Sequence, residues 1–270
     1  MKSSRDMSVL FRLERQLYAL PAMSVTEMVS LASVHAVPQQ ASYMRGLLNL
    51  RGRVLPVVDL RLRLGMTSAT AELESLIEIF NAREQDHKNW IAELEASILE
   101  RRPFGLTTDP TKCAFGRWYA GLKTDDLVLE TYLKRIDLPH RQIHRAGAEA
   151  LERQQSGDYE GASAIARNIR ENALRETLAL MEDARQALRE AHKQLGIVVQ
   201  AAVGAFTVTV DAVESVEQLR DREDDTTEQA LLGSSEPNLM RVRRRMKDDT
   251  LVLEIDPSLI AGADQIRVPA

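Results

Sequence analysis

Histidine and cysteine are scarce in this sequence, and most of them fall in the middle of the chain. The 270 residues include five histidines and one cysteine, and four of these six lie between positions 87 and 144. They are His87, Cys113, His140 and His144. Imidazole and thiolate ligands suit zinc better than magnesium, calcium or manganese. Three imidazoles and one thiolate would therefore complete a tetrahedral zinc shell.

The histidine spacing suits a shared metal ion. His140 and His144 stand four residues apart, which places both imidazoles on one face of a helix about 6 Å apart. His87 occupies an apolar position in a helical pattern, seven residues after Phe80 and seven before Leu94. We therefore expect His87 to point inward.

Cys113 is expected near the start of a short helix. Asp109 and Pro110 form an N-cap signal followed by proline at the first helical position. A helix N-terminus favours the thiolate form of a cysteine. Gly116, one turn further on, would let another helix approach closely. Because a single cysteine cannot form an internal disulfide, Cys113 is a metal ligand, a redox-reactive group, or neither.

Two other interpretations compete with a structural zinc site. A single inward histidine is often a hydrogen-bonded core residue, and a single cysteine in a helix often behaves as a small buried hydrophobe. Four such residues would each need a separate partner, however, because buried polar groups are costly when unpaired. The second alternative is a zinc hydrolase, since three protein ligands and a water form a catalytic site. Four protein ligands leave no such position, and the sequence has no H-E-x-x-H motif.

The elements that position these residues are predicted helices. Apolar residues recur at spacings of three and four through the middle of the chain. The predicted helical segments are 73–98, a short helix opening at 109, 125–155 with a kink or restart at Pro139, and 162–195. Four helical segments with short connections predict a four-helix bundle.

Segments whose residues favour β-strands lie on both sides of the predicted helices in the sequence. Short β-rich segments occur at 8–13, 17–20 and 54–59, and again at 197–200, 206–210, 240–244 and 251–255. This pattern predicts an α+β protein in which a helical insertion splits one β domain. The predicted domains are 1–69, 70–195 and 196–270.

Composition limits the partners and the location. A formal net charge of -5 argues against a nucleic-acid partner, which would need a basic surface. The first residues lack the apolar core of a secretory signal. The longest apolar stretch, 195–210, is too short and too polar to span a bilayer. We therefore expect a cytoplasmic protein without direct membrane insertion.

Three motifs in the helical part resemble a known family. They are His87-Lys88-Asn89-Trp90, Cys113-Ala114-Phe115-Gly116-Arg117-Trp118 and His140-Arg141-Gln142-Ile143-His144. The pattern H-x-x-W, C-x-F-G-x-W and H-x-x-x-H resembles the chemoreceptor zinc-binding domain. The resemblance implies a four-helix bundle in which His87, Cys113, His140 and His144 hold one zinc ion.

The flanking β segments resemble the CheW-like chemotaxis coupling proteins. The resemblance lies in Leu10–Leu13, Tyr18–Pro21, Met44–Arg61 and Val208–Val213. It implies two small β-barrel subdomains similar to SH3 barrels, split here by the insertion. It also implies a non-enzymatic adaptor that joins the chemoreceptor signalling tip to a CheA-type histidine kinase.

Glu27 and Arg51 match a charged pair that this family uses near its receptor and kinase contacts. The alternative for both residues is a surface ion pair of little energetic value.

Together the two resemblances imply an adaptor whose coupling depends on the state of a zinc site, with Cys113 as a redox-sensing ligand. The natural stimulus, zinc level or oxidant, stays open, and so does homo-oligomerisation.

Overall fold

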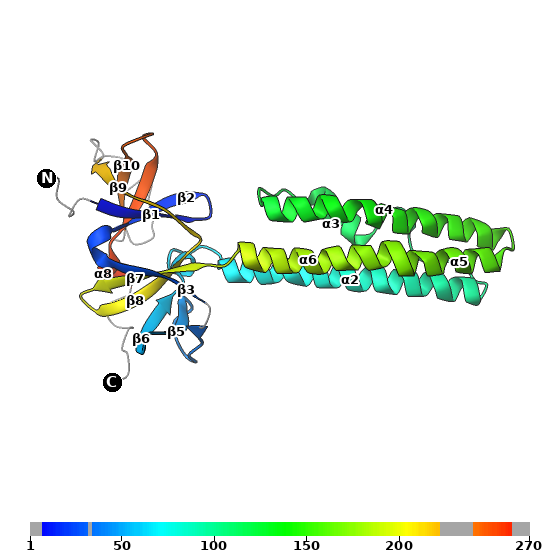
Figure 1. Cartoon of the computed structure of the whole chain (residues 1–270), viewed down its shortest axis with the longest axis horizontal. Coiled ribbons are helices and arrows are strands. Elements are labelled where there is room, and N and C mark those ends of the chain that lie inside the picture. The colour runs from blue at the N-terminus through cyan, green and yellow to red at the C-terminus, as the bar shows by residue number, and fades with distance from the viewer. Residues whose placement is uncertain (1–6, 32–33, 222–239, 261–270) are drawn as a thin grey trace. The chain divides into compact units, whose positions relative to one another are not determined.

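The computed structural model describes residues 7–31, 34–221 and 240–260 (Figure 1). The chain divides into two compact units, 1–71 together with 192–270, and 72–191. The first unit contains the strands and the second is helical. The predicted fold class, a split β domain interrupted by a helical insertion, is therefore confirmed. Among the helices of the described residues, none has the length and apolar character needed to cross a membrane.

The first part of the β unit is a closed five-stranded barrel with the order β1-β2-β11-β10-β9. Its strands are β1 (Met7–Leu13), β2 (Gln16–Pro21), β9 (Ala212–Asp221), β10 (Met240–Arg245) and β11 (Leu251–Ile255). β1 is buried on both faces: Leu10 packs in one apolar cluster with Leu17 and Val252, whereas Phe11 packs in another with Val58 and Val208. A strand covered on both sides reads as a continuous apolar run instead of an alternating one.

The second part is a six-stranded sheet with the order β3-β7-β8-β6-β5-β4. Its strands are β3 (Val25–Ser30), β4 (Val34–His35), β5 (Met44–Leu50), β6 (Arg53–Val58), β7 (Leu195–Ala201) and β8 (Gly204–Val210). The family resemblance implied a second small barrel. Within the part of the chain that the structure describes, this sheet is open, with β3 and the two-residue strand β4 at its edges. The short helical segments of the unit are η2 (Ala22–Ser24), α1 (Leu60–Arg63) and α8 (Pro257–Ile260).

The helical unit lies between α1 and β7 in the sequence. Its elements are α2 (Ala69–Leu99), α3 (Ala114–Gly121), α4 (Leu127–Gln155), α5 (Tyr159–Ile169), the π-helical turn η3 (Arg170–Leu174) and α6 (Arg175–Ala191). The predicted fourth segment is thus α5, η3 and α6 in direct succession. Pro139 lies inside α4 without interrupting it. The apolar faces form two clusters, one around Trp90 and Ile143 and the other around Phe80 and Leu133.

The start of α3 differs from the prediction. Asp109 and Pro110 open a turn, in which Asp109 Oδ1 accepts a hydrogen bond from Thr111 N at 2.9 Å. The helix itself begins four residues later, with Cys113 as its N-cap. An aspartate before a proline stabilises either a turn or a helix start, because its side chain can accept from nearby backbone amides in both.

Candidate metal centre

The structure brings the four predicted ligand residues together. α2 supplies His87, the N-cap of α3 supplies Cys113, and α4 supplies His140 and His144. One ligand atom from each residue lies within 4.8 Å of the others. With zinc–nitrogen bonds of about 2.0–2.1 Å and a zinc–sulfur bond of about 2.3 Å, two ligand atoms of one tetrahedral ion lie roughly 3.3–3.6 Å apart. Small side-chain rotations would therefore complete a tetrahedral shell.

The hydrogen bond of His87 leaves one ring nitrogen available for a metal. Its Nδ1 donates to the carbonyl of Arg83 at 2.7 Å. Nδ1 therefore carries the proton, and Nε2 presents its lone pair toward the other three residues. His87 Nε2 is buried and has no hydrogen-bond partner within the described part of the chain. A backbone carbonyl that orients a ligating imidazole in this way is a common feature of zinc sites.

His140 and His144 add further unpaired nitrogens. Their ring centroids lie 4.9 Å apart, and both side chains are buried. Among the described residues, His140 Nδ1 and both ring nitrogens of His144 lack a hydrogen-bond partner of normal geometry. Buried polar atoms are almost always paired, because leaving one unpaired costs free energy. A cation bound among these rings would accept a lone pair from one nitrogen of each imidazole and so relieve part of this deficit. The residues present therefore fit zinc.

Cys113 caps α3 with its sulfur. Sγ accepts a hydrogen bond from Gly116 N at 3.2 Å and lies 3.2 Å from His140 Nε2. Gly116 was expected to admit a neighbouring helix, but it admits a carbonyl instead. A Cβ atom there would lie 1.9 Å from Pro110 O. The turn from 109 to 116 therefore wraps tightly around the sulfur.

Burial dominates the electrostatics of the four groups. It lowers the pKa of His140 to about 3 and that of His144 to about 4, and the nearby His87 adds to both effects. For His144, the Thr107 carbonyl acts in the opposite direction. The pKa of His87 is also lowered by burial. All three imidazoles are therefore neutral near pH 7, which is the form that binds metal.

The metal-free thiol behaves differently from the prediction. Burial raises the pKa of Cys113, although the amides of Gly116 and Phe115 and the charge of Arg117 oppose the effect. The helix N-terminus thus acts in the expected direction but is outweighed by desolvation. A metal ion would supply the positive charge that the thiolate needs.

A cleft of about 380 Å³ opens beside the cluster. Trp90, Leu106 and Arg117 line it together with Cys113. Cys113 is partly exposed, whereas the three histidines are buried. A dissolved reagent that enters the cleft therefore has access to the sulfur.

The two predicted partner-binding residues lie together in the β unit. Arg51 occupies the β5–β6 turn and Glu27 lies on β3. Arg51 Nη2 is 3.4 Å from Glu27 Oε2, with exposed side-chain fractions of 82% and 32%. Arg51 and Gly52 both have positive φ, at 52° and 83°, as a tight hairpin turn requires. An ion pair this exposed contributes little to stability, so stability alone gives no reason for its presence.

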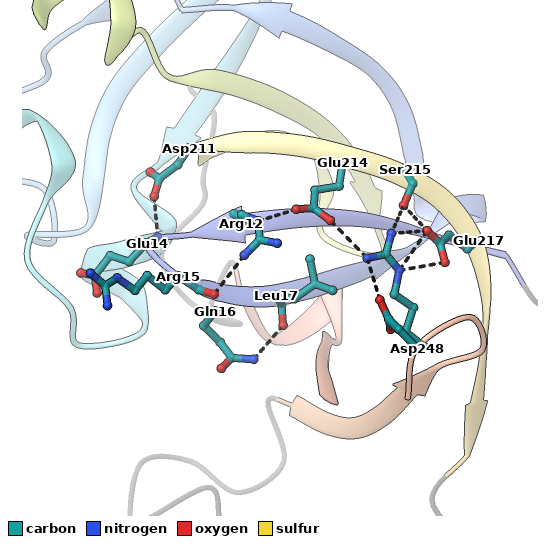
Figure 2. Close-up of polar contacts among 11 residues, drawn as sticks. Arg12, Glu14, Arg15, Gln16, Leu17, Asp211, Glu214, Ser215, Glu217 and Asp248 are labelled. Atoms are coloured by element: carbon teal, nitrogen blue, oxygen red, sulfur yellow. Dashed lines mark hydrogen bonds and ion pairs between the residues drawn. The ribbon is translucent and has the colours of Figure 1, made fainter. Parts of the chain in front are cut away.

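The sequence interpretation missed a buried arginine network in the barrel. Arg245 on β10 is 7% exposed, and its guanidinium pairs with Glu214 and Glu217. Its terminal nitrogens also lie 3.3 Å from Ser215 Oγ and 3.7 Å from Asp248 Oδ2, and all four partner residues are labelled in Figure 2. The pKa of Glu217 falls to about 2, chiefly through its hydrogen bond with Arg245. The available signal was the arginine-rich run in Met240–Arg245, in which a strand places Arg243 and Arg245 on one face.

Two family models match the chain. The model of the CheW-like domain matches residues 8–88, and the model of the chemoreceptor zinc-binding domain matches residues 87–151. The second range contains all four residues of the cluster. The chain thus combines a CheW-like region with a chemoreceptor zinc-binding region, as its motifs indicated.

Curated relatives agree with the first match. The probable chemotaxis protein CheW of Rhizobium etli is 37% identical over 75 residues, which are 28% of this chain and 48% of that protein. The chemotaxis protein CheW of Treponema pallidum is 34% identical over 64 residues, covering 24% and 38% of the two chains. This chain therefore spans less than half the length of these two relatives. The chemotaxis protein CheW of Thermotoga maritima is 26% identical over 124 residues, 46% of this chain and 80% of that protein.

Proposed function

We propose that this chain is a non-enzymatic chemotaxis adaptor that joins the chemoreceptor signalling tip to a CheA-type histidine kinase and is regulated by a zinc site in its helical unit. The observation that carries this proposal is the cluster of three buried imidazoles and one thiol inside a region that interrupts a CheW-like fold. We assign the adaptor to the segments 1–69 and 196–270, and the regulatory unit to 70–195.

The proposed zinc ligands are His87, Cys113, His140 and His144. When bound, a zinc ion would supply four bonds that link α2, the start of α3 and α4. This chain's contribution is to hold three neutral imidazoles with their lone pairs facing one point, and to hold the sulfur beside them. Because the protein fills all four positions, a zinc hydrolase is not favoured: hydrolysis requires an open position for water.

Cys113 is the proposed redox-sensing ligand. A peroxide that enters the cleft would be attacked by the thiolate sulfur: an S–O bond would form as the O–O bond breaks, which leaves a sulfenic acid and releases hydroxide. The oxidised sulfur is a poorer ligand, so we expect zinc affinity to fall and the helices to loosen. The partly exposed position of Cys113 in the cleft supports this role.

Glu27 and Arg51 are the proposed partner-binding residues. Their exposed ion pair on the β unit supports this assignment, because charged residues at the edge of a protein–protein interface affect specificity and association rate more than stability.

One experiment tests the adaptor and its regulation together. Binding to a receptor signalling tip and to a CheA-type kinase is measured with zinc-loaded, chelator-treated and mildly oxidised protein, in wild type and in Cys113→Ser. We expect the loaded wild type to bind both partners, and oxidation to release zinc and change binding in wild type only. If the protein binds neither partner in any of these states, the proposed adaptor function is wrong. Equal responses from the two proteins would reduce Cys113 to a structural ligand.

A further inference from the structure

We propose that Trp90 is the positioning residue of the metal centre: its indole occupies a notch left by Gly147 and tethers the segment that leads to Cys113. This inference rests on the proposed zinc site and identifies what fixes its geometry. A metal shell tolerates only small displacements of its ligands, so residues that lock their surroundings influence affinity without touching the ion.

The indole packs directly against the backbone of α4. Trp90 follows His87 by three residues on α2, and Gly147 follows His144 by three residues on α4. A Cβ atom at Gly147 would lie 2.3 Å from Cη2 of Trp90, a separation that real Cβ atoms do not adopt. The indole and His144 rings lie 5.0 Å apart at an angle of 60°. The glycine therefore admits the outer edge of the indole, and the indole supports the imidazole one turn away.

The other edge of the indole holds the connecting segment. Nε1 of Trp90 donates to the carbonyl of Thr107 at 2.8 Å, and Phe104 packs against the ring with a centroid distance of 5.3 Å. Thr107 precedes Cys113 by six residues, and its hydroxyl accepts a hydrogen bond from Asp109 N at 3.1 Å. Trp90 is 5% exposed, and from its place on α2 the indole contacts both α4 and the segment that leads to Cys113.

The two contacts have separable chemical causes. The notch at Gly147 accommodates the outer six-membered ring, whereas the tether requires the indole N–H. Phenylalanine at position 90 keeps an aromatic ring but lacks the N–H and the atoms that reach Gly147. The steric cost of Gly147→Ala should therefore disappear when residue 90 is phenylalanine, and the loss of the tether should remain.

The test uses the full chain loaded with Co²⁺, whose thiolate charge-transfer band reports whether Cys113 binds the ion. Zinc affinity is measured alongside by competition with a chelating dye. Trp90→Phe should weaken zinc binding about fivefold, as expected for one lost hydrogen bond, and reduce the band. Gly147→Ala should weaken binding at least tenfold, whereas Trp90→Phe/Gly147→Ala should match Trp90→Phe alone. Gly121→Ala is the matched control, because a Cβ there would meet no atom of the described residues within 4 Å.

The outcomes separate this inference from the zinc site itself. Wild type that binds no metal contradicts the proposed centre. Wild type that binds metal, with Trp90→Phe leaving both affinity and the cobalt band unchanged, contradicts the positioning role. If Gly147→Ala lowers zinc affinity by the same factor whether residue 90 is tryptophan or phenylalanine, the proposed packing of the indole against Gly147 is contradicted. If Gly147→Ala alone does not fold, recovery of folding in the double variant supports the notch, and failure to recover overturns it.

Discussion

At the scale of single residues, the site depends on polar atoms that the protein buries without pairing. The Arg83 carbonyl fixes the tautomer of His87. His140 and His144, by contrast, keep ring nitrogens that have no hydrogen-bond partner of normal geometry among the described residues. Such an arrangement destabilises the metal-free protein, and binding of a cation stabilises it. The ligand set therefore makes predictions about both the loaded and the empty protein.

His140→Ala combined with His144→Ala should abolish zinc binding. The pair supplies half of the proposed shell from one helix, so the two remaining ligands cannot hold the ion at comparable affinity. Elemental analysis of the purified proteins measures this directly, with about one zinc per chain expected for wild type. His35→Ala is a suitable control, because His35 lies on β4 in the other unit. Full zinc retention by the double variant would remove both residues from the site.

Metal-free protein should lose stability as the pH falls below about 6.5. The unfolded chain protonates its histidines near their ordinary pKa of about 6.5. The folded chain resists until about 4 for His144 and about 3 for His140. Between these values the unfolded state binds more protons, so the free energy of unfolding falls by up to about 1.4 kcal/mol per pH unit for each group. Thermal unfolding of chelator-treated protein from pH 7.5 to pH 5 measures this. The double variant His140→Ala/His144→Ala should show a weaker dependence of stability on pH. An equally steep dependence in that variant would contradict the role of these two histidines.

How far the site could be predicted differs between its residues. The histidines were predictable because their spacing places them on inward helix faces. The raised pKa of Cys113 was not, because desolvation depends on packing that a helix start alone does not specify. The role of Gly116 was also misjudged, since the close approach involves a carbonyl of its own turn.

At the scale of elements, the site joins two long helices and the cap of a short one. The apolar residues of α2 and α4 recur at helical spacing, and both helices could be predicted almost in full. The start of α3 could not, because Asp109 stabilises a turn where a helix start was expected. The π-helical turn between α5 and α6 also leaves no clear signal in the apolar pattern. The least predictable segment, 100–113, is thus the one that delivers Cys113.

Gly116→Ala should weaken zinc binding by disturbing this segment. The new Cβ would meet Pro110 O at 1.9 Å, so the turn must open and carry the sulfur with it. We expect at least a tenfold loss of zinc affinity and a loss of stability of about 1–3 kcal/mol, typical of overpacking. Dye competition and thermal unfolding measure the two effects. Gly121→Ala, on the same short helix, should change neither, and wild-type affinity in Gly116→Ala would argue against a tight turn.

At the scale of the whole chain, the insertion interrupts the sequence of the β unit without interrupting its sheet. β6 and β7 flank the helical unit in sequence, yet they are not neighbours in the sheet, because β8 lies between them. β6 pairs with β8 in parallel, and β7 pairs with β8 and β3 antiparallel. The insertion therefore replaces a connection and no strand pairing, which is the kind of position where extra chain is tolerated. The sequence predicted the existence of the split, but the strand order depends on long-range pairing that it does not reveal.

Arg51→Ala should weaken partner binding and leave zinc content unchanged. Arg51 belongs to the β unit and the zinc cluster to the helical unit, so the effects of changes in the two should be additive. Pull-down with receptor tip and kinase, together with elemental analysis, measures both properties. Arg53→Ala, on the adjacent exposed position of β6, controls for loss of charge. Unchanged binding by Arg51→Ala would reduce its pairing with Glu27 to a surface contact.

X-ray absorption at the zinc edge of the purified chain would show whether four side chains form a closed zinc site. We expect a four-coordinate ion with one sulfur at about 2.3 Å and three imidazole nitrogens at about 2.0–2.1 Å. A shell without sulfur would remove Cys113 and the redox role that depends on it. An oxygen from water in place of one protein ligand would contradict the closed site and favour hydrolysis instead.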